Sequence, residues 1–175
     1  GLLYFIGHDP RIPKHLQEEM LKWGYPKDEY VDNGHWSHQA YIRETRRMLG
    51  SYVMTQHNCE GKEIVQDGVG MAAYTMDSHN IQRLVVNGMV KNEGDVQVGG
   101  FPPYPISYGS IIPKPADCKN LFVPVCLSAT HIAYGSIRME PVFMVLAQSS
   151  ATAAVLAIDK KLAVQQVDVR ELQTL

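Results

Sequence analysis

The chain has 175 residues, with 16 Lys and Arg against 18 Asp and Glu, which gives a formal charge of −2 at neutral pH. Apolar residues make up 45% and charged residues 19%, a composition that excludes a disordered chain, a collagen and a coiled coil. No basic stripe is present, so neither a nucleic acid nor an anionic membrane is an expected partner. The length suits a single domain with its own core.

The first part of the chain predicts two helices and a loop. An apolar run at residues 2–7 predicts the end of a helix that closes at Gly7. A second helix is predicted over 13–23, because Pro fits its first turn, apolar side chains recur with helical spacing, and Gly24 follows. Residues 25–38 are polar and predict an ordered loop.

Short strands and one capped helix are predicted next. Residues 41–49 fit either a helix or a strand, and we favour a strand. Thr55 is a candidate helix cap, with Asn58 three residues later in place of the Glu or Gln of a capping box. Residues 70–76 are small and apolar and predict a strand.

The sharpest local signal is a β-hairpin over residues 85–90. Asn87 and Gly88 stand between β-branched or long apolar residues, and this pair is preferred in two-residue hairpin turns because both positions need a positive φ. A second turn is predicted at 92–95.

The proline-rich segment 99–105 predicts a stiff extended loop, since proline supports neither a regular helix nor a central strand. Strands are then predicted at 106–112 and 121–125, with a loop over 113–119 between them. Residues 126–138 have mixed polarity, and we interpret part of them as the end of a strand.

A long helix is predicted from Pro141 to Ile158, a stretch without a charged residue. We prefer a buried helix packed on a sheet to a membrane span, because the stretch is short for spanning and contains several polar residues. Four residues fall on one helical face and predict a close approach of another element: Ala147, Ala151, Ala154 and Ile158. A short tail helix is predicted at 169–175, capped by Asp168.

A ligand site is predicted at the beginning of this helix. The first turn of a helix carries unpaired N–H groups and a partial positive charge, which attract an anion. Immediately upstream, residues 128–138 supply hydroxyls, the imidazole of His131 and the guanidinium of Arg138. The alternative is that His131 and Arg138 satisfy buried carbonyl and carboxylate groups.

Other constellations carry weaker signals. Asp77 and His79 are two residues apart, so a strand would place them on one face, as an acid–base pair or as a surface ion pair. The histidines of residues 35–38, together with the segment 57–59, match no strong zinc template, and no metal site is expected.

Two further groups of residues are candidates for binding a substrate. Tyr104 and Tyr108 could form an aromatic wall for a sugar ring, or simply pack in a proline-aromatic loop. Arg43, Arg46 and Arg47 could bind an acidic substrate, or form a solvated face.

Several motifs together resemble the middle motifs and the C-terminal signature of a family of FAD-dependent oxidoreductases, some bacterial members of which carry the label xanthan lyase. The segments that carry the resemblance, in chain order, are 41–48, 74–79, 105–114, 120–131, 133–141 and 144–154. They cover most of the chain from about residue 40 to 158.

The resemblance implies an α+β fold with mixed or antiparallel strands and a long buried C-terminal helix, a fragment of a two-domain flavoprotein fold. Residues 1–118 would belong to a substrate or cap region, and 119–175 would be the strand–loop–helix element that returns to the FAD domain. No G-x-G-x-x-G motif is present, so the N-terminal Rossmann half is expected to be missing, and this fragment by itself is expected to be inactive. The apolar start at Gly1 also suggests a fragment or a processed product.

The resemblance also implies site residues. Ser128, Ala129, His131 and the first turn at Pro141 and Val142 would lie near the flavin, where the helix dipole stabilises negative charge. Within this framework His131 and Arg138 would act near the reacting centre, and His131 would transfer protons.

The implied function is hydride transfer between a small organic substrate, such as one derived from a sugar, and FAD held in the full-length protein. The alternatives are a lyase of the xanthan type, with a Tyr or His base, and a non-catalytic structural or interaction module.

Overall fold

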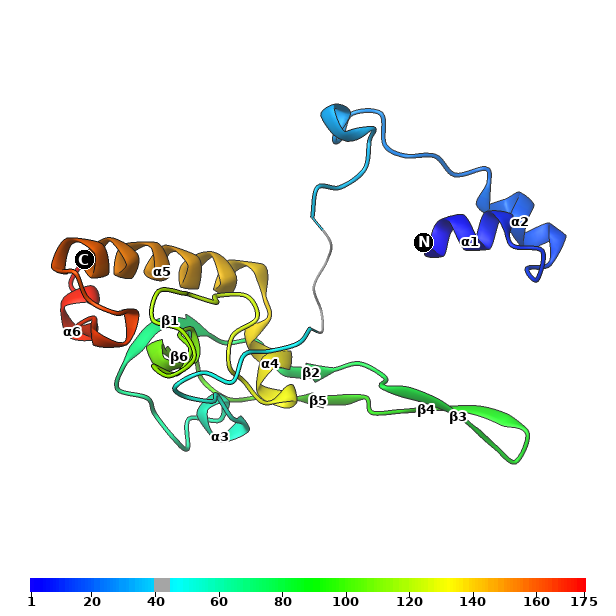
Figure 1. Ribbon diagram of the computed structural model, residues 1–175. Coiled ribbons are helices and arrows are strands. Elements are labelled where there is room, and N and C mark those ends of the chain that lie inside the picture. Colours follow the sequence, from blue (N-terminus) through cyan, green and yellow to red (C-terminus); the bar gives the residue numbers. More distant parts are fainter. Residues whose placement is uncertain (40–44) are drawn as a thin grey trace. The chain divides into compact units, whose positions relative to one another are not determined.

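The computed structural model describes residues 1–39 and 45–175. The chain divides into two compact units, 1–41 and 42–175 (Figure 1). The two units are described separately below.

The N-terminal unit consists of short helices. Helix α1 spans Leu2–His8, α2 spans Lys14–Met20, and the 3₁₀ turn η1 spans Val31–Asn33. Both predicted helices are therefore present, although Pro13 is the N-cap of α2 and the helix ends earlier than expected. Most of the large apolar side chains of this unit are exposed.

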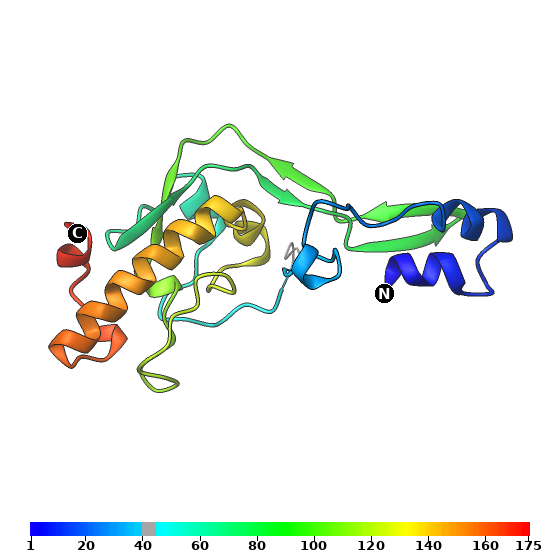
Figure 2. The same ribbon diagram turned by 90° about the horizontal axis from the view of Figure 1, so that it is seen from above.

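The larger unit contains three two-stranded antiparallel sheets, which pair β1 with β6, β2 with β5 and β3 with β4. The strands are β1 (Gly68–Ala72), β2 (Met76–Ser78), β3 (Gln82–Val86), β4 (Met89–Glu93), β5 (Val96–Val98) and β6 (Tyr104–Ser107). Strands β2 and β5 continue into the β3–β4 hairpin, so that the four form one long arm (Figures 1 and 2). The α+β class expected from the sequence is confirmed.

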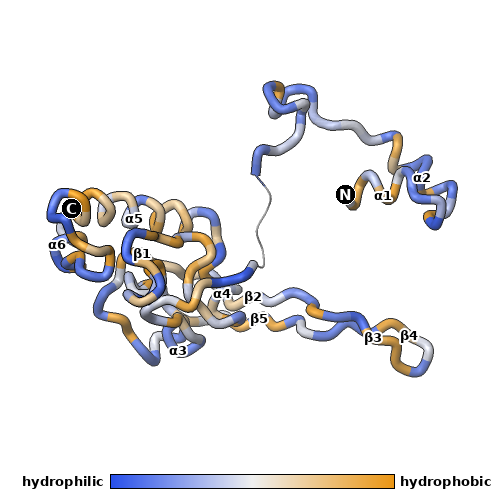
Figure 3. The backbone as a smooth tube through the Cα atoms, in the orientation of Figure 1, coloured by the Kyte–Doolittle hydropathy of each residue, from blue (hydrophilic) through white to orange (hydrophobic). Residues whose placement is uncertain are grey.

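The predicted hairpin is confirmed. Val85 pairs with Val90, and Asn87 and Gly88 form the turn with φ values of 53° and 74°. The predicted second turn follows β4, where Gly94 has a φ of 99°. Both strands of this hairpin are exposed, and its tip is apolar (Figure 3).

Two predicted strands are wrong. Only the beginning of the segment 106–112 is in a strand, because the chain turns at once into a 3₁₀ helix, η2 (Tyr108–Ser110). The segment 121–125 has no regular structure. Its Val123 donates one backbone hydrogen bond to Ile111, and Pro124 has no N–H to continue a ladder.

The strand predicted over 41–49 can be compared with the structure only in part, because residues 41–44 lie outside the described residues. Residues 45–49 contain no strand. The helix expected after Thr55 is present as α3 (Gln56–Cys59), and the Asn58 side chain accepts a hydrogen bond from the Thr55 N–H at 2.8 Å. Asn58 thus takes the role that Glu or Gln has in a capping box.

The long C-terminal helix is present as α5 (Glu140–Lys160) and packs against β1 (Figure 2). Its buried face consists of Leu146, Ser150, Ala153 and Ala157. The predicted contact stripe is wrong, because Ala147, Ala151 and Ile158 are exposed. The hydropathy of the stretch did not distinguish its faces, since small and apolar residues occur all around it.

Helix α5 is long and apolar enough to cross a membrane, and it is the only such helix among the described residues. Of its most apolar 18-residue window, 28% is buried within the protein. A single helix of this kind is weak evidence for a span.

The C-terminal segment after α5 packs against that helix and adds Val164 and Leu172 to the core. The 3₁₀ turn η3 (Val164–Gln166) and helix α6 (Val169–Leu172) both contact α5. The predicted Asp168 cap is confirmed, because its side chain accepts a hydrogen bond from the Arg170 N–H at 2.9 Å. The Tyr108 hydroxyl donates to the Val164 carbonyl at 2.6 Å and ties η2 to this end of the chain.

Candidate functional site

The candidate site is built on a helix where the sequence predicted the end of a strand. Helix α4 spans His131–Ile137, with Arg138 as its C-cap, so the two predicted catalytic residues lie at its two ends. Strand β2 packs along α4. Gly135 makes this possible, because a Cβ at this position would lie 2.7 Å from the Asp77 carbonyl oxygen.

At the beginning of α4, His131 contacts β2. Its Nε2 lies 2.8 Å from the Ser78 Oγ. Ser78 is 2% exposed and His131 is half-buried. The imidazole is therefore held by a side chain 53 residues away in the sequence.

At the end of α4, Arg138 forms a buried ion pair. Its Nη2 donates to the Asp77 Oδ2 at 2.9 Å and to the Asp77 carbonyl at 3.2 Å. The same Oδ2 lies 3.3 Å from Nε2 of His79, whose side chain is half exposed. The predicted contact between Asp77 and His79 is thus present, and Arg138 satisfies a buried carboxylate as the alternative interpretation proposed.

The segment before α4 is buried. Ala129 forms a parallel bridge with Met54, and the Ser128 N–H donates to the Ser110 carbonyl at 2.8 Å. The Ser128 Oγ is buried and has no hydrogen-bond partner among the described residues. A buried hydroxyl without a partner is rare in folded proteins and needs an explanation.

Arg47 also contacts the segment that precedes α4. Its Nε donates to the Ala129 carbonyl at 3.0 Å, and its guanidinium lies over the Tyr134 ring, 5.2 Å from the centroid. Arg47 is half-buried, whereas Arg46 is exposed and Arg43 lies outside the described residues. A contact of this kind positions the backbone of the segment rather than presenting a cation to a substrate.

The first turn of α5 follows directly after α4 (Figure 1). Glu140 and Pro141 are exposed, and Val142 is half-buried against the core. The beginning of the 21-residue helix is therefore not covered by packed side chains from the described residues. Pro141 has no N–H, and the Val142 and Phe143 N–H groups donate to the Met139 carbonyl at 3.0 and 3.1 Å. The first turn therefore offers the Glu140 N–H and the positive end of the helix dipole.

Comparison with known proteins identifies the family of this chain. The model of the family described as FAD dependent oxidoreductase matches residues 2–175. The chain belongs to this family. No curated protein and no solved structure matches it. The resemblance predicted from the sequence motifs is thereby confirmed, and a flavin-dependent redox activity is the activity of the family.

As a member of an FAD-dependent family, the chain can be tested for its fit to that cofactor. The exposed first turn of α5 is a feature that would suit the flavin end, where N–H donors meet the polar edge of the ring, whereas the unbonded Ser128 hydroxyl is fully buried. The sequence contains no G-x-G-x-x-G loop for the pyrophosphate. The start of α5 would therefore suit the flavin ring, whereas the sequence offers no such loop for the ADP part.

The tyrosines that supported a lyase are buried. Tyr104 is 1% exposed, and its hydroxyl donates to Ser136 at 2.7 Å; Tyr108 is bonded to Val164. Burial raises the pKa of both phenols, with Cys59 beside Tyr104 adding to the rise there. Neither tyrosine is placed to act as a base on a bound polymer.

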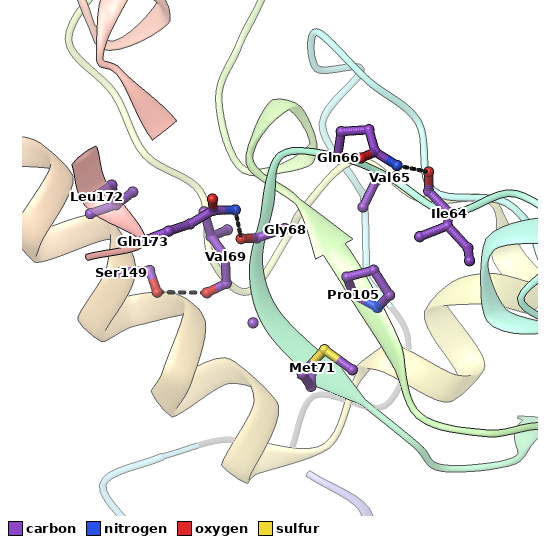
Figure 4. Close-up of a pocket in the computed structure, with 11 residues that line it drawn as sticks. Ile64, Val65, Gln66, Gly68, Val69, Met71, Pro105, Ser149, Leu172 and Gln173 are labelled. Carbon is purple, nitrogen blue, oxygen red and sulfur yellow. Dashed lines mark hydrogen bonds between the residues drawn. The ribbon is translucent and has the colours of Figure 1, made fainter. Parts of the chain in front are cut away.

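Two surface hollows of the larger unit lie away from α4. One, of about 510 Å³, lies between β1, α5 and α6, where Ser149 Oγ donates to the Val69 carbonyl and Gln173 Nε2 to the Gly68 carbonyl (Figure 4). The other, of about 440 Å³, is lined by residues around Phe122 and the end of α5. Neither contains a predicted site residue. In the described part of the chain, no group of three or more His, Cys, Asp or Glu side chains could hold a metal.

Buried acidic groups predict an alkaline loss of stability. Burial raises the pKa of the Cys59 thiol as well as those of Tyr104 and Tyr108. The unfolded chain therefore releases these protons at a lower pH than the folded chain, so it binds fewer protons above about pH 9, and the free energy of unfolding falls as the pH rises. Urea unfolding between pH 8 and about 10.5 should show this fall, and Tyr108→Phe should make it shallower. An equal slope in the variant would contradict the assignment.

The sequence did not indicate that β2 would be the partner of α4. It singled out Asp77 and His79 but not Ser78, whose role depends on a contact across 53 residues. The one available signal was the pair Asp77 and Ser78, since adjacent polar residues are unusual in a buried strand.

Proposed function

We propose that this chain forms the flavin-side part of the active site of an oxidoreductase that oxidises or reduces a small organic substrate, such as a sugar derivative. The ADP part of FAD would be held by a Rossmann half outside this sequence. When bound, FAD supplies the hydride transfer. The observation that supports the proposal most directly is the exposed first turn of α5, which follows directly on Arg138 at the end of α4.

The chain's own residues would have distinct tasks. The backbone N–H of Glu140 and the positive end of the α5 dipole would stabilise negative charge on the ring edge. His131 would accept a proton from, or return it to, a substrate hydroxyl. Arg138 is committed to Asp77, so we propose that it keeps α4 in place and adds a positive field rather than contacting substrate.

Replacement of His131 by Ala should slow flavin reduction about 100-fold or more, because general acid–base catalysis is lost, while FAD binding should weaken less than threefold. The measurement is anaerobic stopped-flow reduction of the full-length protein loaded with FAD, by a panel of aldoses and aldonates. FAD binding is followed by fluorescence. His57→Ala is a matched control, because this histidine in α3 has an exposed side chain whose charged partner is Glu60. An equal loss of FAD binding and reduction would contradict the role of His131.

A further inference from the structure

One of the two hollows of the larger unit lies at the C-terminal end of α5. Its volume is about 440 Å³, within the range of about 300–1,000 Å³ that is common for small-molecule sites. The residues of α5 that line it begin at Ala154, so the hollow is more than about 20 Å from the first turn of the helix. The proposed function therefore leaves this hollow without a role.

A Schellman motif shapes one side of the hollow. Lys161 ends α5 with a φ of 55°, in the left-handed region. Its N–H donates to the Ile158 carbonyl at 3.1 Å, and the Leu162 N–H donates to the Ala157 carbonyl at 2.8 Å. This pair of hydrogen bonds turns the chain back at the end of the helix.

Hydrogen bonds and an aromatic contact hold the segment 119–122 beside this turn. The Val164 N–H donates to the Lys119 carbonyl at 3.0 Å. The Phe122 ring lies edge-on to the Tyr108 ring, with 6.1 Å between the centroids, and the Tyr108 hydroxyl donates to the Val164 carbonyl. The hollow is therefore pre-formed, which lowers the cost of binding.

The lining combines apolar side chains with basic ones. The charged residues in it are Lys119 and Lys161, both exposed, and no acidic side chain of the described residues lines it. Across residues 1–39 and 45–175 neither lysine is in an ion pair, whereas the adjacent Lys160 is bonded to Glu171. The apolar lining residues are Phe122, Ala154, Ala157, Ile158, Leu162 and Val164.

The balance of charge decides the sign of a ligand. The C-terminal end of a helix carries about half a negative charge, which opposes an anion. Lys119 and Lys161 carry two full positive charges. Asp159, in the last turn of α5, is exposed and does not line the hollow. Even with Asp159 counted in full the sum stays positive, so the rim favours an anion.

We propose that this hollow binds a small monocarboxylate with an apolar body, such as an arylalkanoate. The body packs against Phe122 and the alanines of α5, and the carboxylate pairs with Lys119 and Lys161 at the rim. Burial of apolar surface supplies most of the affinity, because an exposed ion pair changes a dissociation constant by no more than about fivefold.

The test is a titration of the full-length protein with 4-phenylbutyrate. Binding is followed by the methyl signal of Ile158, which lines the hollow and is assigned with Ile158→Val. A dissociation constant of about 1 mM is expected for a ligand of this size. The neutral 4-phenylbutyramide should bind about tenfold more weakly, and the cationic 4-phenylbutylamine more weakly still. An Ile158 signal that does not move up to about 10 mM, or an amide that binds as tightly as the carboxylate, would overturn the proposal.

Charge variants test the two lysines. Lys119→Gln and Lys161→Gln should each weaken 4-phenylbutyrate about fivefold and leave 4-phenylbutyramide unchanged. Lys91→Gln is the matched control, because it removes the same charge from an exposed lysine of β4 that does not line the hollow. If Lys91→Gln weakens the carboxylate as much as Lys161→Gln does, the attraction comes from net charge alone and the proposal fails.

A second pair of variants tests the apolar part. Ala154→Leu fills the hollow and should abolish the binding of both compounds. Ala151→Leu makes the same change at an exposed position of α5 that does not line the hollow, and should leave binding unchanged. Unaltered binding in Ala154→Leu would show that the compounds bind elsewhere.

Discussion

Replacing Asp77 with Ala is expected to lower the free energy of unfolding by about 3–5 kcal/mol, because it removes one half of a buried ion pair with Arg138. The Arg138 side chain is 2% exposed and its Nη2 donates to Asp77 at 2.9 Å. Desolvation of the charge is complete in the folded state, whereas the unfolded state hydrates it. The measurement is urea unfolding followed by circular dichroism at pH 7.

The double variant Asp77→Ala with Arg138→Met separates the ion pair from the packing. A methionine fills much of the volume of the arginine stem and carries no charge, so the double variant should regain more than about 1.5 kcal/mol over Asp77→Ala. His79, which shares the Asp77 oxygen, serves as a control, because His79→Ala removes only an exposed partner and should cost less than about 1 kcal/mol. Strictly additive losses in the double variant would show that the pair is not coupled.

Replacing Gly135 with Ala is expected to destabilise the protein by about 1–3 kcal/mol, although alanine is the better helix former by about 1 kcal/mol. The added Cβ would lie 2.7 Å from the Asp77 carbonyl oxygen, 3.2 Å from its carbonyl carbon and 3.3 Å from its nitrogen. All three are backbone atoms, so no side-chain rotation relieves the overlap. Strand β2 must move away from α4.

The same substitution at Gly24 is the control, because nothing lies within 4 Å of a Cβ there and its φ is not in the left-handed region. Gly24→Ala should leave the unfolding transition unchanged. Gly135→Val should destabilise the protein more than Gly135→Ala does. A stabilised Gly135→Ala variant would mean that α4 and β2 do not pack as closely as described.

Local chemistry made some elements predictable. The Asn87-Gly88 turn and the Asp168 cap depend on neighbouring residues only, and both occur where expected. Helix α5 was predictable from an uncharged run that begins with proline at its first turn. The face that α5 buries was not, because the choice depends on which residues meet β1.

Other elements were decided by contacts that the sequence does not display. The predicted strand over 106–112 is interrupted because the Asp67 carboxylate accepts hydrogen bonds from Ser107 Oγ and from the Gly109 N–H, which favours a 3₁₀ turn. Helix α4 has a glycine at its centre, which lowers its helix propensity. Packing of that glycine on β2 outweighs the propensity.

By itself, the sequence determined the family, the α+β class and the candidate residues His131 and Arg138, because motifs and local propensities are properties of neighbouring residues. Only the tertiary structure decided what these two residues contact. His131 meets Ser78, and Arg138 meets Asp77, because Gly135 lets β2 approach α4 closely enough for a hydroxyl and a carboxylate to reach both ends of the helix.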